Sequence, residues 1–207
     1  MNIQDAYTNW SASYDSERNL TRDLDQTVTR DSLANLRYQS ILELGCGTGK
    51  NTAFLARIGA QVHALDFSTG MLAQARAKRP AAHVNFKQAD ITQPWPCANQ
   101  SVDLIVCNLV LEHIQELSFI FSEAARVLMP GGRMFICELH PFRQYQGCQA
   151  NFQHGPDTVA IPAFTHHISE FIDTAARHGL KLQTLREWWH QTDQNKAPRL
   201  VSFLFEK

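Results

Sequence analysis

Residues 40–51 read S-I-L-E-L-G-C-G-T-G-K-N, and this stretch decides the fold of the chain. The apolar run from Ser40 to Leu44 is typical of a buried strand, and glycines follow at positions 45, 47 and 49. Residues 52–58 then place apolar side chains on one face of a helix. A strand that turns through Gly-x-Gly-x-Gly into a helix exposes bare backbone N–H groups, so a ligand can lie directly against the turn.

The following residues repeat the alternation of strand and helix. Ser68 is a suitable N-cap for a helix, and Pro80 stops that helix. Strands are expected at residues 62–66, 84–88, 102–107 and 133–139, with helices at 69–79 and 113–128. Five strands that alternate with helices predict a doubly wound sheet of parallel strands.

The two ends of the chain depart from this alternation. Residues 2–14 carry four apolar side chains on one helical stripe, and residues 26–38 are a second helix candidate beyond a polar stretch. We therefore expect residues 1–38 to form N-terminal cap helices. Near the other end, a helix at 169–178 precedes two strands at 181–189 and 200–205, which a short loop forces to pair antiparallel.

Residues 140–167 form the one long segment without the periodicity of a strand or helix. Prolines and glycines interrupt it, and it is too long for a simple connection, so we predict a lid or binding loop. Aromatic side chains in and after this segment offer apolar surface: Phe142, Tyr145, Phe152, Phe164, Trp188 and Trp189.

Composition bounds the class of protein. The 207 residues suffice for one α/β domain, and a net charge of −1 with scattered Lys and Arg gives no footprint for nucleic acid. The five cysteines never occur as C-x-x-C, which favours reduced thiols in a cytoplasmic protein. No apolar run approaches the roughly 20 residues that span a membrane. We expect a single domain over residues 1–207.

The motifs in this order resemble the class I (Rossmann-like) methyltransferases that use S-adenosylmethionine (SAM), in their small-molecule branch. The resemblance rests on E-L-G-C-G-T-G at 43–49, Asp66, A-D-I at 89–91, N-L-V-L-E-H-I at 108–114 and R-V-L-M-P-G-G at 126–132. It implies an α/β fold with a doubly wound, mainly parallel sheet of seven strands in the order 3-2-1-4-5-7-6, in which strand seven is antiparallel.

The residues favour SAM without the family name. Gly45 and Asp66 are 21 positions apart, about the interval at which an acid at the next strand end reaches a ribose. A dinucleotide loop needs a third glycine where Lys50 stands. A P-loop needs a Ser or Thr where Asn51 stands, and a glycine where Leu44 stands.

The resemblance also implies roles for individual residues. Glu43 and the 45–47 backbone would meet the amino-acid end of SAM, Asp66 its ribose hydroxyls, and Asp90 its adenine amino group. Phe67 and Met71 could equally be ordinary core residues, and Tyr14 an ordinary packing residue. The full set of expected cofactor-binding residues is Tyr14, Arg22, Glu43, Gly45, Cys46, Gly47, Asp66, Phe67, Met71, Asp90, Ile91 and Asn108.

Histidines are the candidates for a general base, which helps only if the acceptor arrives protonated. His140 ends the fifth strand, His167 closes the predicted lid, and His113 follows Glu112. Each could instead line the substrate pocket without moving a proton. In some family members an E-H pair at this place joins a metal site with further acids, which are not evident here, so no metal is predicted.

The leading hypothesis is an enzyme that transfers methyl from SAM to an O, N or C nucleophile of a small molecule. The aromatic residues of the lid favour a partly apolar or aromatic acceptor, and Arg143 could meet an anionic one. The alternatives are a non-catalytic module that binds SAM or S-adenosylhomocysteine (SAH) and, disfavoured by the glycine loop, an NAD-dependent oxidoreductase. The oligomeric state stays open.

Overall fold

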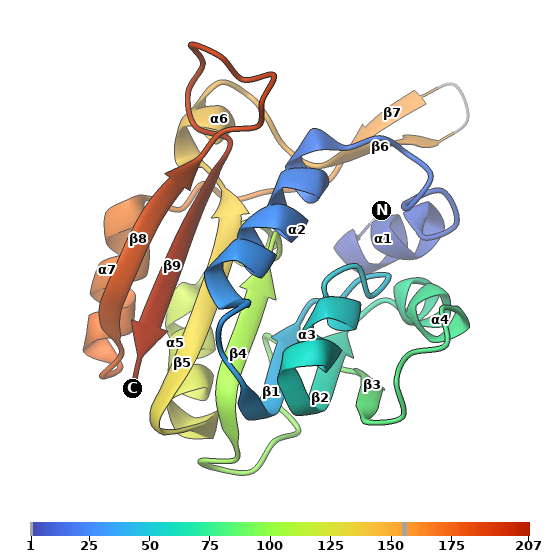
Figure 1. The fold of residues 1–207 in the computed structure, drawn as a ribbon. Helices are drawn as coiled ribbons and strands as arrows, with labels where there is room; N and C mark the ends of the chain where they lie inside the picture. The colour runs from blue at the N-terminus through green and yellow to red at the C-terminus, as the bar shows by residue number, and fades with distance from the viewer. Residues whose placement is uncertain (1, 155–156) are drawn as a thin grey trace.

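A computed structural model describes residues 2–154 and 157–207, without the side chains of residues 152–154 and 157. Its main sheet has the strand order β3-β2-β1-β4-β5-β9-β8 (Figure 1), and the order predicted from sequence is confirmed. Strands β1 to β5 run parallel, whereas β9 is antiparallel to both of its neighbours. The strands are β1 (Tyr38–Leu44), β2 (Gly59–Asp66), β3 (Val84–Gln88), β4 (Val102–Asn108), β5 (Leu128–Leu139), β8 (Lys181–Trp188) and β9 (Leu200–Glu206).

Helices cover both faces of this sheet. On one face α2 (Leu20–Leu33), α3 (Thr52–Ile58) and α4 (Thr69–Ala77) bury their apolar sides, and on the other lie α5 (Leu117–Val127) and α7 (Ile168–Arg177). Strand β1 shows why both faces are apolar: Ile41 packs with α2 and α3, whereas Leu42 packs with α5. A strand buried on both faces is typical of a parallel sheet.

Several predicted boundaries hold, and others shift. Helix α3 and strand β3 match the expected ranges, and the Ser68 hydroxyl accepts the Met71 N–H at 3.2 Å as the N-cap of α4. Helix α5 starts four residues later than expected, because residues 111–113 form a separate 3₁₀ turn, η1 (Leu111–His113). Strand β5 begins at Leu128 and includes the Pro-Gly-Gly turn.

The N-terminal helices were predicted less well. Helix α1 (Ile3–Trp10) ends four residues early, and α2 starts at Leu20, six residues before the expected start. The Asn19 side chain caps α2 by accepting from the backbone N–H groups of residues 21 and 22. Arg22 and Asp25 on this first part of α2 are buried. Because these inward-facing side chains are polar, the apolar periodicity that identifies a helix is missing here.

The predicted lid segment, residues 140–167, contains a short helix α6 (Pro141–Tyr145) and a hairpin of β6 (Asn151–His154) and β7 (Asp157–Ala160). Figure 1 shows both near the carboxyl ends of the parallel strands, with the hairpin beside α1. Buried Ile161 packs against Ala6 and Trp10 of α1. The N-terminal helix and the lid therefore form one cover over this edge. The side chain of Phe152, and residues 155–156, lie outside the described part.

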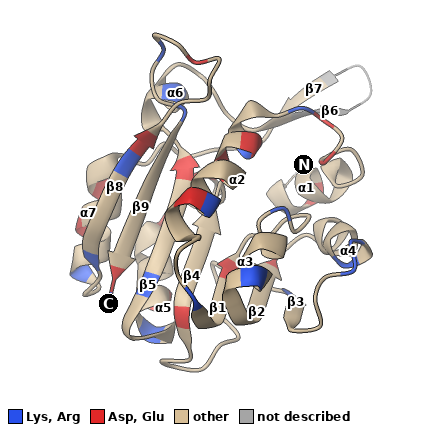
Figure 2. Cartoon of the chain, in the orientation of Figure 1, with Lys and Arg blue, Asp and Glu red and all other residues tan. Residues whose placement is uncertain are grey.

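Charges and thiols show no concentration on one element. Figure 2 shows Lys and Arg positions distributed among Asp and Glu positions over the described elements. All five cysteines are free thiols, and three of them are buried. None of the helices in residues 2–154 and 157–207 is both long and apolar enough to cross a bilayer.

Candidate active site

The glycine loop leaves β1 in the conformation that its sequence predicts. Gly45, Gly47 and Gly49 all have positive φ angles, of +66°, +53° and +80°. The Cys46 N–H donates to the Leu65 carbonyl at 2.9 Å, which ties the loop to the end of β2. A Cβ added to Gly47 would meet no atom within 4 Å, so the loop backbone borders open space.

Gly45 differs from Gly47, and this difference gives a prediction. A Cβ at Gly45 would lie 2.2 Å from Cγ2 of Val110. Gly45→Ala should therefore destabilise the ligand-free protein by about 2 kcal/mol or more, through steric overlap added to an unfavourable φ. Gly131→Ala is the control, because Gly131 also has a positive φ but no neighbour within 4 Å, and it should cost about 1 kcal/mol. Urea denaturation measures both, and equal losses would contradict the overlap.

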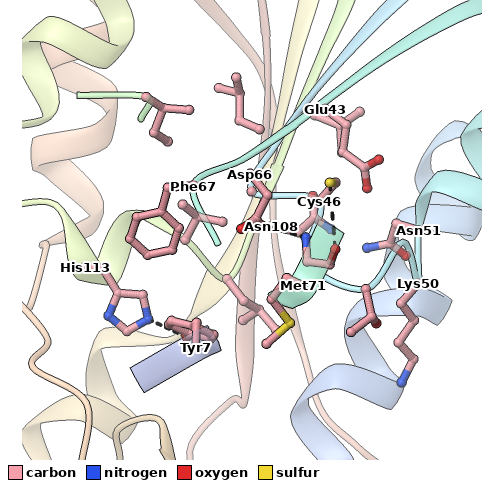
Figure 3. A pocket seen from close by; sticks show the side chains of 18 of the residues that line it. Tyr7, Glu43, Cys46, Lys50, Asn51, Asp66, Phe67, Met71, Asn108 and His113 are labelled. Atoms are coloured by element: carbon pink, nitrogen blue, oxygen red, sulfur yellow. Dashed lines mark hydrogen bonds between the residues drawn. The ribbon is translucent and has the colours of Figure 1, made fainter. Parts of the chain in front are cut away.

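A cavity of about 270 Å³ opens beside this loop (Figure 3). All twelve of the cofactor-binding residues predicted from sequence line it. They come from the ends of β1, β2, β3 and β4, from the start of α4 and from the N-terminal cap. The ligands of open α/β sheets bind at this carboxyl edge, at the point where the strand order reverses.

Asp66 at the end of β2 holds the glycine loop in place. Its Oδ2 accepts the Gly47 N–H and its Oδ1 the Ser68 N–H, both at 2.8 Å. Burial raises the pKa of the Asp66 carboxyl to about 6, although these backbone N–H groups act in the opposite direction. The remaining lone pairs of an ionised carboxylate beside an open cavity suit the hydroxyl pair of a ribose.

A buried polar network closes the opposite end of the cavity. Asp25 of α2 accepts from Nδ2 of Asn51 at 2.8 Å and from Nδ2 of Asn108 at 2.5 Å. This arrangement turns the Oδ1 atoms of both asparagines to positions where they have no hydrogen-bond partner among the described residues. Two buried acceptors without donors, at the edge of a cavity, suit a ligand that brings N–H groups, such as an ammonium.

Glu43 stands next to this network. Its Oε2 accepts from the Thr52 hydroxyl at 2.6 Å. Burial raises the pKa of the Glu43 carboxyl to about 8, with Asp25 and Asp66 adding to the effect. An arriving cation would favour the ionised form, so the site is electrostatically prepared for positive rather than negative charge.

The N-terminal cap closes the cavity from outside. The Arg22 guanidinium lies 3.9 Å from the ring centroid of Tyr14 and donates to the backbone carbonyls of Tyr14 and Glu17. Arg22 is 7% exposed, so its guanidinium is largely shielded from solvent and is held by stacking on Tyr14 and by the two carbonyl oxygens. Both residues line the cavity.

Of the predicted catalytic histidines, the structure brings only His113 to the cavity. Its Nδ1 faces the Pro162 carbonyl at 2.9 Å and therefore carries the proton, so Nε2 accepts from the Tyr7 hydroxyl at 2.7 Å. Burial lowers the pKa of His113, which favours this neutral form. Figure 3 shows the His113 and Tyr7 side chains meeting beside Phe67.

His140 and His167 lie elsewhere. The fully buried His140 caps α6 by accepting the Phe142 N–H, and its Nε2 donates to Glu187 of β8 at 2.9 Å. Exposed His167 pairs with the hydroxyl of Tyr145 at 2.5 Å. Neither lines the cavity, so their predicted proton-transfer role finds no support in this geometry. His140 follows β5, but its side chain turns to α6 and β8, and His167 precedes α7 at the surface.

Sequence reasoning missed Tyr7, Asp25 and Asn51, which line the cavity. Tyr7 was read only as part of the apolar stripe of α1. Asp25 has a signal in hindsight, since Arg22, Asp25 and Thr29 lie on one side of a helix at spacings of three and four. In residues 2–154 and 157–207, no group of three or more His, Cys, Asp or Glu side chains is placed to hold a metal ion.

A doubly wound sheet with this loop, and with acids at the following strand ends, defines a nucleoside-binding α/β protein. Residues 42–136 match the family described as methyltransferase domain. The chain is 30% identical over 156 residues to a ubiquinone biosynthesis O-methyltransferase of Xanthomonas oryzae, covering 73% of this chain and 63% of that protein. It is 38% identical over 114 residues to a demethylmenaquinone methyltransferase of Clavibacter sepedonicus, covering 55% and 46%.

The fold agrees with solved structures. An N-methyltransferase, NodS from Bradyrhizobium japonicum in complex with SAH, superposes with a TM-score of 0.74 at 18% identity, over 100% of this chain and 99% of that one. Residues 42–136 therefore belong to the methyltransferase domain family, and the chain as a whole has the fold of solved SAM-dependent methyltransferases. It spans less than two thirds of the length of the two curated relatives described above.

Proposed function

We propose that this protein transfers the methyl group of SAM to an O, N or C nucleophile of a small molecule. The observation that carries the proposal is the chemistry of the cavity wall. Four carboxyl groups (Asp25, Glu43, Asp66 and Asp90) line it together with Asn51 and Asn108, whose buried Oδ1 atoms have no hydrogen-bond partner among the described residues. These oxygens suit the ammonium and sulfonium of SAM and would repel the pyrophosphate of a dinucleotide.

The chemistry that SAM supplies is a methyl group on a good leaving group, so the chain has mainly to align the acceptor. A lone pair of the acceptor forms the new bond to the methyl carbon, the carbon–sulfur bond breaks, and its electrons stay on sulfur to give SAH. We assign residues 1–38 and 140–167 the task of closing over both reactants. The acceptor is a small molecule. The lid aromatics Phe142, Tyr145 and Phe164 are exposed and do not line the cavity, so the aromatic surface beside the cofactor comes from Tyr7 and Tyr14 and favours a partly apolar or aromatic body.

The proton of a protonated acceptor needs a destination, and His113 offers one. An acceptor O–H or N–H beside Tyr7 can pass its proton to the Tyr7 oxygen while the Tyr7 proton moves to Nε2 of His113. The imidazolium so formed is stabilised by the Pro162 carbonyl at Nδ1 and by Glu112, whose Oε1 lies 3.8 Å from Nε2. His113 is therefore the preferred base among the predicted histidines.

His113→Gln should lower kcat by about 100-fold, the range of a lost general base, while SAH affinity stays within a few-fold. Turnover is measured at saturating acceptor, with SAH affinity from calorimetry. His178→Ala is the control, because His178 contacts the Ser118 hydroxyl at 3.0 Å, away from the cavity. An unchanged kcat in His113→Gln would remove His113 from the proton path.

The proposed activity is tested by incubating the protein with SAM and pools of small molecules, with mass spectrometry of the products. The expected result is SAH together with an acceptor that has gained one methyl group. A protein that binds SAM and SAH tightly but produces neither product with any pool would instead be a non-catalytic SAM-binding module.

A further inference from the structure

A second, smaller cavity of about 160 Å³ adjoins the first on the side of the lid. Four residues line both cavities, namely Tyr7, Tyr14, Arg22 and Leu109, so the two cavities are neighbours. The predicted cofactor residues at the strand ends line the first cavity and not the second. A ligand in the second cavity would thus reach the cofactor cavity across the tyrosines of the N-terminal cap.

Two arginines on the lid side share a single carboxylate. Arg199 donates to both oxygens of Asp193, at 2.7 and 2.6 Å, and Arg143 lies 3.0 Å from the same carboxylate. The Asp193 side chain is 1% exposed, and the hydrogen bonds from Arg199 lower its pKa to about 2, so it is ionised. Two guanidinium groups against one carboxylate leave a positive charge without its counter-ion.

Arg22 adds a further cation to this cavity. Its recorded hydrogen bonds go to two backbone carbonyls, which carry no charge. Arg143 donates through Nε and Nη2 to the carbonyls of residues 197 and 198, and no hydrogen bond of its Nη1 is recorded within the described residues. The Glu17 carboxylate accepts from the Trp10 indole and the Ser13 hydroxyl, and no hydrogen bond between this carboxylate and Arg22 is present among the described residues.

Glu112 supplies a hydrogen-bond acceptor to the same cavity. Its side chain is 7% exposed, and its Oε2 has no hydrogen-bond partner among the described residues. Burial raises the pKa of the Glu112 carboxyl to about 7. A buried oxygen without a donor is unfavourable by itself, and a ligand N–H or O–H would satisfy it.

We propose that the second cavity is the acceptor site and that the acceptor is a small carboxylic acid with a hydroxyl or amino group on an apolar or aromatic body. The carboxylate meets the guanidinium groups of Arg143, Arg199 and Arg22, the hydroxyl or amino group meets Glu112, and the body packs against Trp10. An uncharged quinone ring would leave the arginines unbalanced. This inference rests on the proposed function and names its substrate class.

The test uses the 207-residue chain saturated with SAH and pairs of probes in which a carboxylate is replaced by an uncharged carboxamide. The probes are salicylate and salicylamide, anthranilate and anthranilamide, and phenylalanine and phenylalaninamide, with binding followed by ligand-observed NMR. The acids should bind at least about tenfold more tightly than their amides, the loss expected when charge-assisted hydrogen bonds are removed. Equal binding of acids and amides, or no acid binding at millimolar concentration, overturns the inference.

Arg143→Gln should abolish the preference for acids, and Arg143→Lys should keep part of it. Arg133→Gln is the matched control, because Arg133 pairs with Glu206 at 3.4 Å and lines neither cavity. Thermal stabilisation by SAH shows that each variant is folded. A full preference for acids in Arg143→Gln contradicts the assignment of the carboxylate to Arg143.

Glu112→Gln gives the second arm of the test. Salicylate should bind the unaltered protein more tightly than benzoate, because its hydroxyl reaches Oε2 of Glu112, and this advantage should shrink in the variant. An advantage that persists in full would remove Glu112 from acceptor recognition. The acceptor class and the proposed function fail through different results. If SAH stabilises the protein but acids bind no better than their amides, only the acceptor class is refuted. If SAH has no effect on stability, the proposed activity itself is refuted.

Discussion

Asp66→Ala is expected to weaken the binding of SAM and SAH by about 100-fold or more. The substitution removes the acceptor for the proposed ribose hydroxyls and, at the same time, the two backbone hydrogen bonds that hold Gly47 and Ser68. Hydrogen bonds to a charged group contribute about 1.5–3 kcal/mol each, so the loss of two of them accounts for this factor. Calorimetric titration with SAH measures it.

The control for Asp66→Ala is Asp103→Ala. The Asp103 carboxylate also accepts two backbone N–H groups, those of Gln39 and Ser40, at 2.7 and 3.0 Å. These groups belong to the start of β1, at the edge of the sheet opposite the glycine loop. Asp103→Ala should lower stability without lowering SAH affinity. Equal loss of affinity in the two variants would mean that general destabilisation, rather than cofactor binding, explains the effect at Asp66.

Glu43 should make cofactor affinity depend on pH. The pKa of Glu43 is about 8 in the ligand-free protein, so the carboxyl is mostly protonated at pH 7, and binding of the ligand ammonium must release that proton. Affinity for SAH should therefore rise with pH by up to about tenfold per unit below pH 8 and level off above it. In Glu43→Gln the affinity should be lower at pH 8 and this pH dependence should disappear.

Titration of the ligand amino group affects both proteins equally, so the difference between Glu43→Gln and the unaltered protein isolates Glu43. Glu138→Gln is the matched control. Burial raises the pKa of Glu138 to about 8 as well, yet its oxygen accepts from the backbone of residues 110 and 111 and does not line the cavity. Identical slopes in Glu43→Gln and the unaltered protein would contradict the ammonium contact.

The same pKa shifts predict how pH affects folding. A carboxyl whose folded pKa is raised from 4.5 to about 8 binds more protons in the folded than in the unfolded state between these values. The contribution of Glu43 and Glu138 to the free energy of unfolding is therefore fully present below about pH 4.5 and is lost as pH rises through 8. This sign is opposite to that of Asp193, whose lowered pKa adds stability above about pH 4, and this stability is lost as pH falls through about 2.

The strands and the glycine loop could be predicted because local rules determine them. Alternating or continuous apolar runs identified β1 to β5, and glycines with positive φ at 45, 47 and 49 marked the turn that a bound ligand needs. The motif order placed twelve residues on one cavity, because the carboxyl ends of parallel strands meet at one edge. The roles of those twelve residues remain predictions.

The start of α2, the orientation of His140 and the arginine pair at Asp193 could not be predicted, because they depend on tertiary contacts. The start of α2 is polar because Arg22 and Asp25 face the site instead of solvent, so hydrophobic periodicity placed the helix six residues too late. His140 was singled out by its place after β5, but its side chain turns away to cap α6 and pair with Glu187. The arginine pair around Asp193 joins the lid to the β8–β9 loop, a contact that no local pattern records.

The cavity beside the glycine loop is expected to bind SAM. Denaturation experiments on the 207-residue chain test this expectation by comparing its stabilisation by SAM, SAH and NAD. SAM and SAH at 100 times their dissociation constants should each add about 2.7 kcal/mol to the free energy of unfolding, and NAD should add nothing. Stabilisation by NAD alone, with no effect of SAM or SAH, would contradict the account.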